Sequence, residues 1–135
     1  MSAHTILVVD DSPTAQKITC DALKEQGFNV ISAADGEEAL EIASRLHPDL
    51  IVLDIILPKK NGFQVCRQLK TESATENIKV LMLSSKNQAS DKFWGQKQGA
   101  DAYITKPFED EELLAAIEAL LTGENLAQLK TNLNA

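Results

Sequence analysis

Short apolar runs recur along the chain and alternate with longer amphipathic segments. The first run, Thr5-Ile6-Leu7-Val8-Val9, is continuous and rich in β-branched residues, which is typical of a strand buried on both faces of a parallel sheet. Four similar runs follow it. The predicted strands cover residues 5–9, 29–33, 50–53, 79–83 and 102–105.

Segments with helical periodicity separate these strands. Apolar residues recur three or four positions apart, which places them on one face of a helix. Residues 88–98 are less regular but contain no proline, and they complete a set of five predicted helices. The four regular segments lie within residues 15–23, 39–46, 65–69 and 113–121.

This alternation predicts an α/β fold, in which helices cover both faces of a doubly wound, five-stranded parallel sheet. Ser12-Pro13 supplies an N-cap hydroxyl followed by proline at the first helical position. We expect one domain over residues 1–121 and a C-terminal tail over residues 122–135. The tail either frays or forms a short amphipathic turn through Leu126, Leu129 and Leu133.

Composition and charge narrow the class of protein. Apolar residues make up 44% of the 135 residues and charged residues 24%, as expected of one soluble globular domain. With 13 basic and 20 acidic residues, the net charge of −7 opposes binding to nucleic acid or anionic lipid. The sequence starts without a basic, hydrophobic leader, has no apolar run of membrane-spanning length, and contains only two cysteines. We therefore expect a cytoplasmic protein without membrane insertion.

Polar side chains follow four of the predicted strands: Asp10-Asp11, Asp54, Ser84 and Lys106. The carboxyl ends of parallel strands meet at one edge of a sheet, where ligands bind. Carboxylates brought together there repel each other by about 4 kcal/mol per pair at a separation of about 4 Å. A cation is therefore expected among them, and Mg²⁺ prefers such hard oxygen ligands.

The residue types at this edge suit phosphoryl transfer. Asp54 is the best candidate nucleophile, because a carboxylate attacks a phosphoryl group once a metal offsets their mutual repulsion. Asp10 and Asp11 would hold the metal, while Ser84 and Lys106 would contact phosphoryl oxygens. The predicted product is an aspartyl phosphate.

The sequence resembles the receiver domains of two-component response regulators, of the stand-alone chemotaxis type. The resemblance covers residues 5–121 and implies a flavodoxin-like strand order of 2-1-3-4-5, with Asp54 phosphorylated by a sensor histidine kinase. It implies a signalling switch rather than an enzyme with a separate catalytic domain. The segments that carry it are Val-Val-Asp-Asp-Ser, Leu-Asp-Ile-Ile-Leu-Pro with Asn61-Gly62, Leu-Ser-Ser, and Gly-Ala-Asp-Ala-Tyr-Ile-Thr-Lys-Pro-Phe.

The resemblance also assigns residues around Asp54. The backbone carbonyl of Ile56 would complete the metal ligands, Ser84 and Tyr103 would be the switch pair, and the bond from Lys106 to Pro107 would be cis.

Phosphate lifetime is assigned to Ile56 and Lys86, which border the approach of the hydrolytic water in the resembling family. Hydrolysis needs a water aligned with the phosphorus, and the apolar side chain of Ile56 cannot orient one. Lys86 either lies across the phosphate or is fully solvated. The Ile56 side chain therefore predicts slow loss of the phosphoryl group, and Lys86 adds to this only where it lies across the phosphate.

A closer resemblance, carried by residues 90–100, is to regulators associated with type IV pili and twitching or phototactic motility. We therefore expect a downstream motility or signalling protein as partner. Phe93 and Trp94 are candidates for the partner surface, although ordinary core packing is the favoured alternative for Trp94.

Two other functions compete with the phosphorylation switch. A pseudo-receiver would bind a partner without phosphorylation, although every residue type of the phosphate site is present. A flavodoxin-like flavin carrier would need a phosphate loop rich in Ser, Thr and Gly, whereas residues 10–14 read Asp-Asp-Ser-Pro-Thr. After residue 121 too little chain remains for an output domain, so we expect output through binding.

Overall fold

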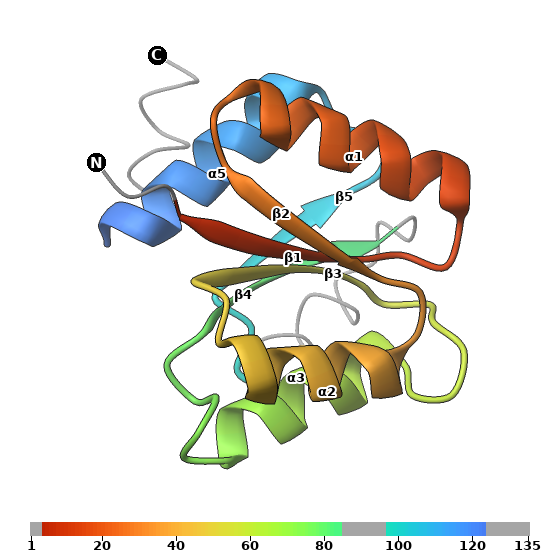
Figure 1. Ribbon diagram of the computed structural model, residues 1–135, viewed down its shortest axis with the longest axis vertical. Coiled ribbons are helices and arrows are strands. Elements are labelled where there is room, and N and C mark those ends of the chain that lie inside the picture. Colours follow the sequence, from red (N-terminus) through yellow and green to blue (C-terminus); the bar gives the residue numbers. More distant parts are fainter. Residues whose placement is uncertain (1–3, 85–96, 124–135) are drawn as a thin grey trace.

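The computed structural model describes residues 4–84 and 97–123, and its strands form one parallel sheet (Figure 1). The strand order is β2-β1-β3-β4-β5, which confirms the predicted doubly wound, flavodoxin-like topology. The strand order reverses at β1, so the crevice for ligands lies between the ends of β1 and β3. The strands are β1 (Thr5–Val9), β2 (Asn29–Ala33), β3 (Leu50–Asp54), β4 (Lys79–Ser84) and β5 (Ala102–Thr105).

Helices cover both faces of the sheet. In Figure 1, α1 and α5 lie against one face, and α2 and α3 lie against the other. No helix in the described part of the chain is long and apolar enough to cross a membrane. The predicted helix over residues 88–98 and the predicted tail fall largely outside the described residues. The described helices are α1 (Pro13–Glu25), α2 (Gly36–Leu46), α3 (Gly62–Thr71) and α5 (Asp110–Thr122).

Side-chain caps fix where the helices begin. The hydroxyl of Ser12 accepts a hydrogen bond from the Ala15 amide at the start of α1, and Asp35 caps α2 in the same way. At α3, Asn61 and Gln64 form a reciprocal capping box with two bonds of 3.0 Å. Each cap satisfies amides that the first turn leaves without partners, so each loop enters its helix at a defined residue.

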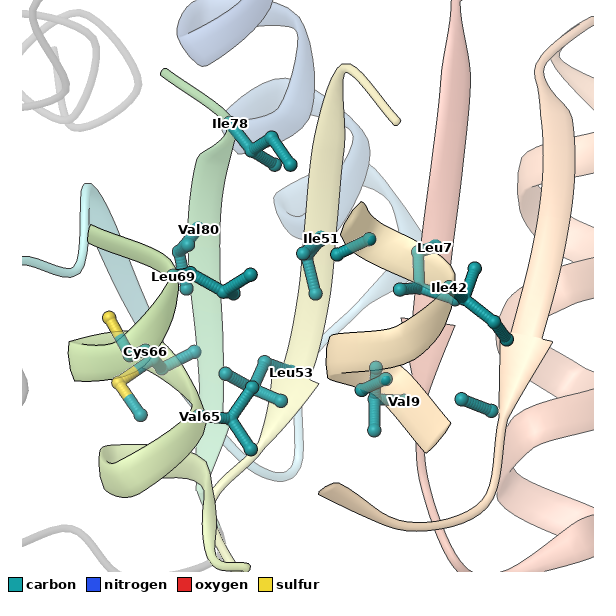
Figure 2. Packing of buried hydrophobic residues seen from close by; sticks show 14 of the residues in the cluster. Leu7, Val9, Ile42, Ile51, Leu53, Val65, Cys66, Leu69, Ile78 and Val80 are labelled. Atoms are coloured by element: carbon teal, nitrogen blue, oxygen red, sulfur yellow. The ribbon is translucent and has the colours of Figure 1, made fainter. Parts of the chain in front are cut away.

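Alternating strand residues build two separate cores. Leu7 and Val9 of β1, with Ile51 and Leu53 of β3, face α2 and α3 (Figure 2). Their neighbours along the strands pack against α1 and α5 on the other face. Because both faces are buried, the strands are continuously apolar, and each slip of one residue would exchange the two cores.

Strand register brings the carboxyl ends of the central strands level. Val9 pairs with Leu53, and Asp54 pairs with Leu83. On the far side, Ser84 pairs with Thr105. The residues that end these strands or directly follow them therefore meet at one edge of the sheet.

The loop after β3 is packed closely against the start of α3. The Gly62 amide donates a 2.7 Å hydrogen bond to the Ile55 carbonyl. A Cβ at position 62 would lie 2.5 Å from the Asp54 carbonyl oxygen and 2.7 Å from the Ile55 Cα. Both atoms belong to the backbone, so this approach requires glycine.

We predict that Gly62→Ala lowers the free energy of unfolding by about 3 kcal/mol, because the backbone of β3 must shift to admit the methyl group. Gly27→Ala is the control, since a Cβ there meets no atom within 4 Å but must adopt a φ of +91°. It should cost only about 1 kcal/mol. Urea denaturation measures both values, and a cost at position 62 no larger than at position 27 would show that the loop moves aside freely.

Candidate functional site

Three carboxylates meet at the carboxyl edge of the sheet. Asp10 and Asp11 follow β1, Asp54 ends β3, and one oxygen from each lies within 4.8 Å of the others. Asp10 and Asp54 are buried, whereas Asp11 is exposed. The structure therefore brings together the three predicted carboxylates, and the cluster is accessible to solvent at Asp11.

Backbone and side-chain hydrogen bonds hold Asp10. Its amide donates to the Ala33 carbonyl at 3.1 Å, and its Oδ1 accepts from the Ser12 amide at 2.9 Å. The side-chain amide of Gln16 donates to the carbonyls of Asp10 and Ala33. Gln16 is not predictable as a site residue from the sequence, because a glutamine in the first turn of a helix is normally solvated.

A lysine and a backbone amide contact Asp54. Lys106 Nζ lies 3.1 Å from Asp54 Oδ2 and 3.8 Å from Asp10 Oδ2, while the Ile56 amide donates to Asp54 Oδ1 at 3.3 Å. The Lys106 amide donates a 2.6 Å hydrogen bond to the Ser84 carbonyl, which ties the ends of β4 and β5 together. The bond from Lys106 to Pro107 is cis, as the resemblance implies.

The acidic cluster is short of positive charge. Burial raises the pKa of the Asp10 carboxyl, and the neighbouring Asp54 and Asp11 raise it further. The Ser12 amide and the Lys106 ammonium oppose this rise. Within the described residues, one lysine thus faces three carboxylates, and a divalent cation would neutralise the remaining negative charge.

The remaining predicted site residues differ in how deeply they are buried. Ser84 is buried at the end of β4, and Ile56 is 58% exposed directly beyond Asp54. Tyr103 is half-buried in β5 and packs against the core on the α2 and α3 side. Lys86, Phe93 and Trp94 lie outside the described residues.

The loop between β3 and α3 is fastened to the start of α2, a feature that the sequence analysis missed. The Gly36 amide donates to the Pro58 carbonyl at 3.4 Å. Lys59 has a φ of 68°, and its ammonium lies 3.8 Å from Asp35, the N-cap of α2. This contact is not predictable from the sequence, since a left-handed backbone at a lysine has no residue signature.

Comparison with known proteins decides the family. A model of the response regulator receiver domain matches residues 6–118. The chain belongs to this family. The resemblance inferred from the strand-end motifs is confirmed, and the acidic cluster of this receiver domain lies where its strand order reverses.

Two curated relatives differ in length. The receiver domain is 42% identical over 118 residues to Protein PilH of Pseudomonas aeruginosa, covering 87% of this chain and 98% of PilH. It is 45% identical over 116 residues to the DNA-binding dual master transcriptional regulator RpaA of Synechocystis sp., covering 86% of this chain and 48% of RpaA. The chain thus spans about half the length of RpaA.

Solved structures share the fold. Chemotaxis response regulator CheY4 of Vibrio cholerae superimposes with a TM-score of 0.83 at 30% identity, covering 88% of this chain and 99% of CheY4. The receiver domain of sensor histidine kinase PA1611 from Pseudomonas aeruginosa gives 0.83 at 26% identity, covering 90% and 99%. That structure holds a magnesium ion coordinated in its active site cleft.

We predict that Asp10→Asn stabilises the receiver domain in the absence of divalent cations. A carboxyl group with a raised pKa in the folded state binds its proton more tightly there, so the free energy of unfolding falls as pH rises through that pKa. At pH 7 the ionised group therefore destabilises the fold, and the amide removes this charge while still accepting from Ser12. The expected gain is about 0.5–2 kcal/mol.

Urea denaturation in EDTA measures this gain. Asp21→Asn is the control, because Asp21 is exposed on α1 and pairs with Lys17 at 2.9 Å. It should give no stabilisation. If Asp10→Asn is no more stable than the wild type at pH 7, repulsion at the site does not weaken the fold.

Proposed function

We propose that this receiver domain is a single-domain response regulator that accepts a phosphoryl group on Asp54 from a sensor histidine kinase, in a reaction that requires Mg²⁺. The convergence of Asp10, Asp11 and Asp54 with Lys106 at one sheet edge carries this proposal. These residues come from the ends of three different strands, β1, β3 and β5, so their convergence depends on the fold and not on one surface segment.

The residues present fit a magnesium ion. Asp10, Asp11 and Asp54 offer only oxygen ligands, and the Ile56 carbonyl is the further ligand that the family resemblance assigns. The PA1611 receiver domain, with its bound magnesium ion, supports this choice. When bound, Mg²⁺ would supply the positive charge that lets an anionic phosphoryl group approach a carboxylate.

The transfer itself is a nucleophilic substitution at phosphorus. An Asp54 carboxylate oxygen forms the new O–P bond, the N–P bond of the kinase phosphohistidine breaks, and its electron pair stays on the imidazole nitrogen. Lys106, 3.1 Å from Asp54 Oδ2, offsets negative charge as the phosphoryl oxygens arrive. Ser84 and Lys106 then contact the phosphoryl group.

Output follows from a change in partner binding. The charge added at Asp54 draws the Ser84 hydroxyl toward the phosphoryl group, and Tyr103 responds on the neighbouring strand. The likeness to a chemotaxis response regulator supports a role in motility or taxis signalling, for which we propose a cytoplasmic location. We assign no catalytic activity on a further substrate, beyond phosphorylation and dephosphorylation of the chain itself.

Asp54→Ala should abolish phosphorylation, because Asp54 lies nearer to the Lys106 ammonium, at 3.1 Å, than Asp10 does, at 3.8 Å. The measurement is phosphate incorporation from acetyl phosphate, with Mg²⁺ and with EDTA. Asp21→Ala, which removes an exposed carboxylate on α1, should label like the wild type. Persistent stoichiometric labelling of Asp54→Ala would remove the assignment, and a wild type that takes neither phosphate nor beryllofluoride would favour the pseudo-receiver.

The same proteins test the output. Wild-type chain treated with acetyl phosphate should capture its partner from a cell extract more strongly than untreated chain, and Asp54→Ala should show no such difference. Equal capture by all samples would assign partner binding to the unphosphorylated surface instead.

Ile56→Asn should shorten the lifetime of the phosphoryl group measurably. Ile56 is 58% exposed beside Asp54, and an amide there can orient the attacking water that an isoleucine cannot. Ile18→Asn is the matched control, since Ile18 is 61% exposed on α1, and its decay should equal that of the wild type. Loss of labelled phosphate over time gives the rates, and equal decay of Ile56→Asn and wild type would place lifetime control elsewhere.

A further inference from the structure

The side chain of Gln16 connects the loop after β1 to the end of β2, at the edge of the acidic site. Its Nε2 donates to the Asp10 carbonyl at 3.1 Å and to the Ala33 carbonyl at 2.9 Å. Gln16 lies in the first turn of α1 and is half-buried. Both protons of the side-chain amide are therefore used on backbone oxygens, one after β1 and one at the end of β2.

The Asp10 carbonyl belongs to the peptide group that joins Asp10 to Asp11. Its hydrogen bond with Gln16 therefore restrains the plane of that peptide, and the plane sets the direction in which the Asp11 side chain leaves the backbone. The other bonds to Asp10 reach its amide and its Oδ1. Gln16 is the described side chain that holds the carbonyl.

A restraint at this point opposes the repulsion within the site. Without a cation, Asp10, Asp11 and Asp54 favour a wider spacing, and Asp11 is the exposed member with room to move. A loop that opens in this way would have to be reassembled when a cation binds. A loop that is held in place would bind the cation with less loss of conformational freedom.

We propose that Gln16 is a positioning residue that keeps the peptide between Asp10 and Asp11 oriented for Mg²⁺. This inference rests on the proposed function, because it concerns the same metal site. Both hydrogen bonds of the Gln16 side-chain amide go to backbone carbonyls and not to the carboxylates. Gln16 acts through the backbone of the two ligands that follow β1.

The test is a Mg²⁺ titration followed by the NMR shifts of the Asp11 and Ser12 amides. Gln16→Met keeps the length and helix propensity of the side chain but removes both donors, and it should weaken Mg²⁺ binding by about tenfold. Gln16→Arg keeps two N–H donors and should recover most of the affinity. Gln26→Met, at the far end of α1 where the side chain is exposed, should bind like the wild type.

A merely structural role would give a different result. Gln16→Met would then lose stability in urea but bind Mg²⁺ with wild-type affinity, and this outcome would overturn the inference alone. If the wild type shows no Mg²⁺ response at Asp11, the proposed function fails and the inference fails with it. Should Gln16→Met not fold, Gln16→Glu provides the second test, because it places a carboxylate oxygen where a donor stood, and unchanged affinity in that variant would also overturn the inference.

Discussion

Repulsion among three carboxylates is the constraint on which this receiver domain is built. The oxygens of Asp10, Asp11 and Asp54 lie within 4.8 Å of one another, and charges at such distances repel by several kcal/mol, roughly 4 per pair, at an intermediate dielectric. Two backbone amides and one lysine offset part of this repulsion. The Ser12 amide donates to Asp10, the Ile56 amide donates to Asp54, and Lys106 pairs with both carboxylates. Each donor reduces the penalty, and together they leave a deficit of positive charge that suits a divalent ion.

The opposite edge of the sheet shows how the same chain treats a carboxylate that serves only the fold. There, Asp101 Oδ2 accepts from the Val80 amide and from Lys70 Nζ, each at 2.8 Å. Lys70 also donates to the Ile78 carbonyl at 2.7 Å. This acid is matched by one base and by a backbone amide, so its charge is compensated within the fold. Asp101 is thus paired as a structural carboxylate is, whereas the three clustered carboxylates keep the excess negative charge that is typical of a binding site.

Much of this architecture can be predicted from the sequence, because its causes are local. Continuous β-branched runs predict the buried strands, Ser12 predicts the start of α1, and residues at the ends of parallel strands necessarily share an edge. The contacts that tune the site have no such signature. Gln16 and Lys59 act on backbone carbonyls and on a left-handed turn, and the same residue types occur on any solvated helix or loop. Their partners are set by the packing of β2 beside β1, which only the folded chain defines.

The connection between the site and the surface follows from the pairing of β4 with β5. The Ser84 carbonyl accepts from the Lys106 amide at 2.6 Å, so the proposed switch residue and the proposed phosphate-binding lysine are tied through their backbones. Met82 of β4 pairs with Tyr103 of β5, two residues before Ser84 along the strand. A pull on the Lys106 ammonium or the Ser84 hydroxyl therefore acts on two strands that are joined by hydrogen bonds up to this point. Tyr103 is half-buried rather than enclosed, so its side chain has room to change its position when the strand ends do.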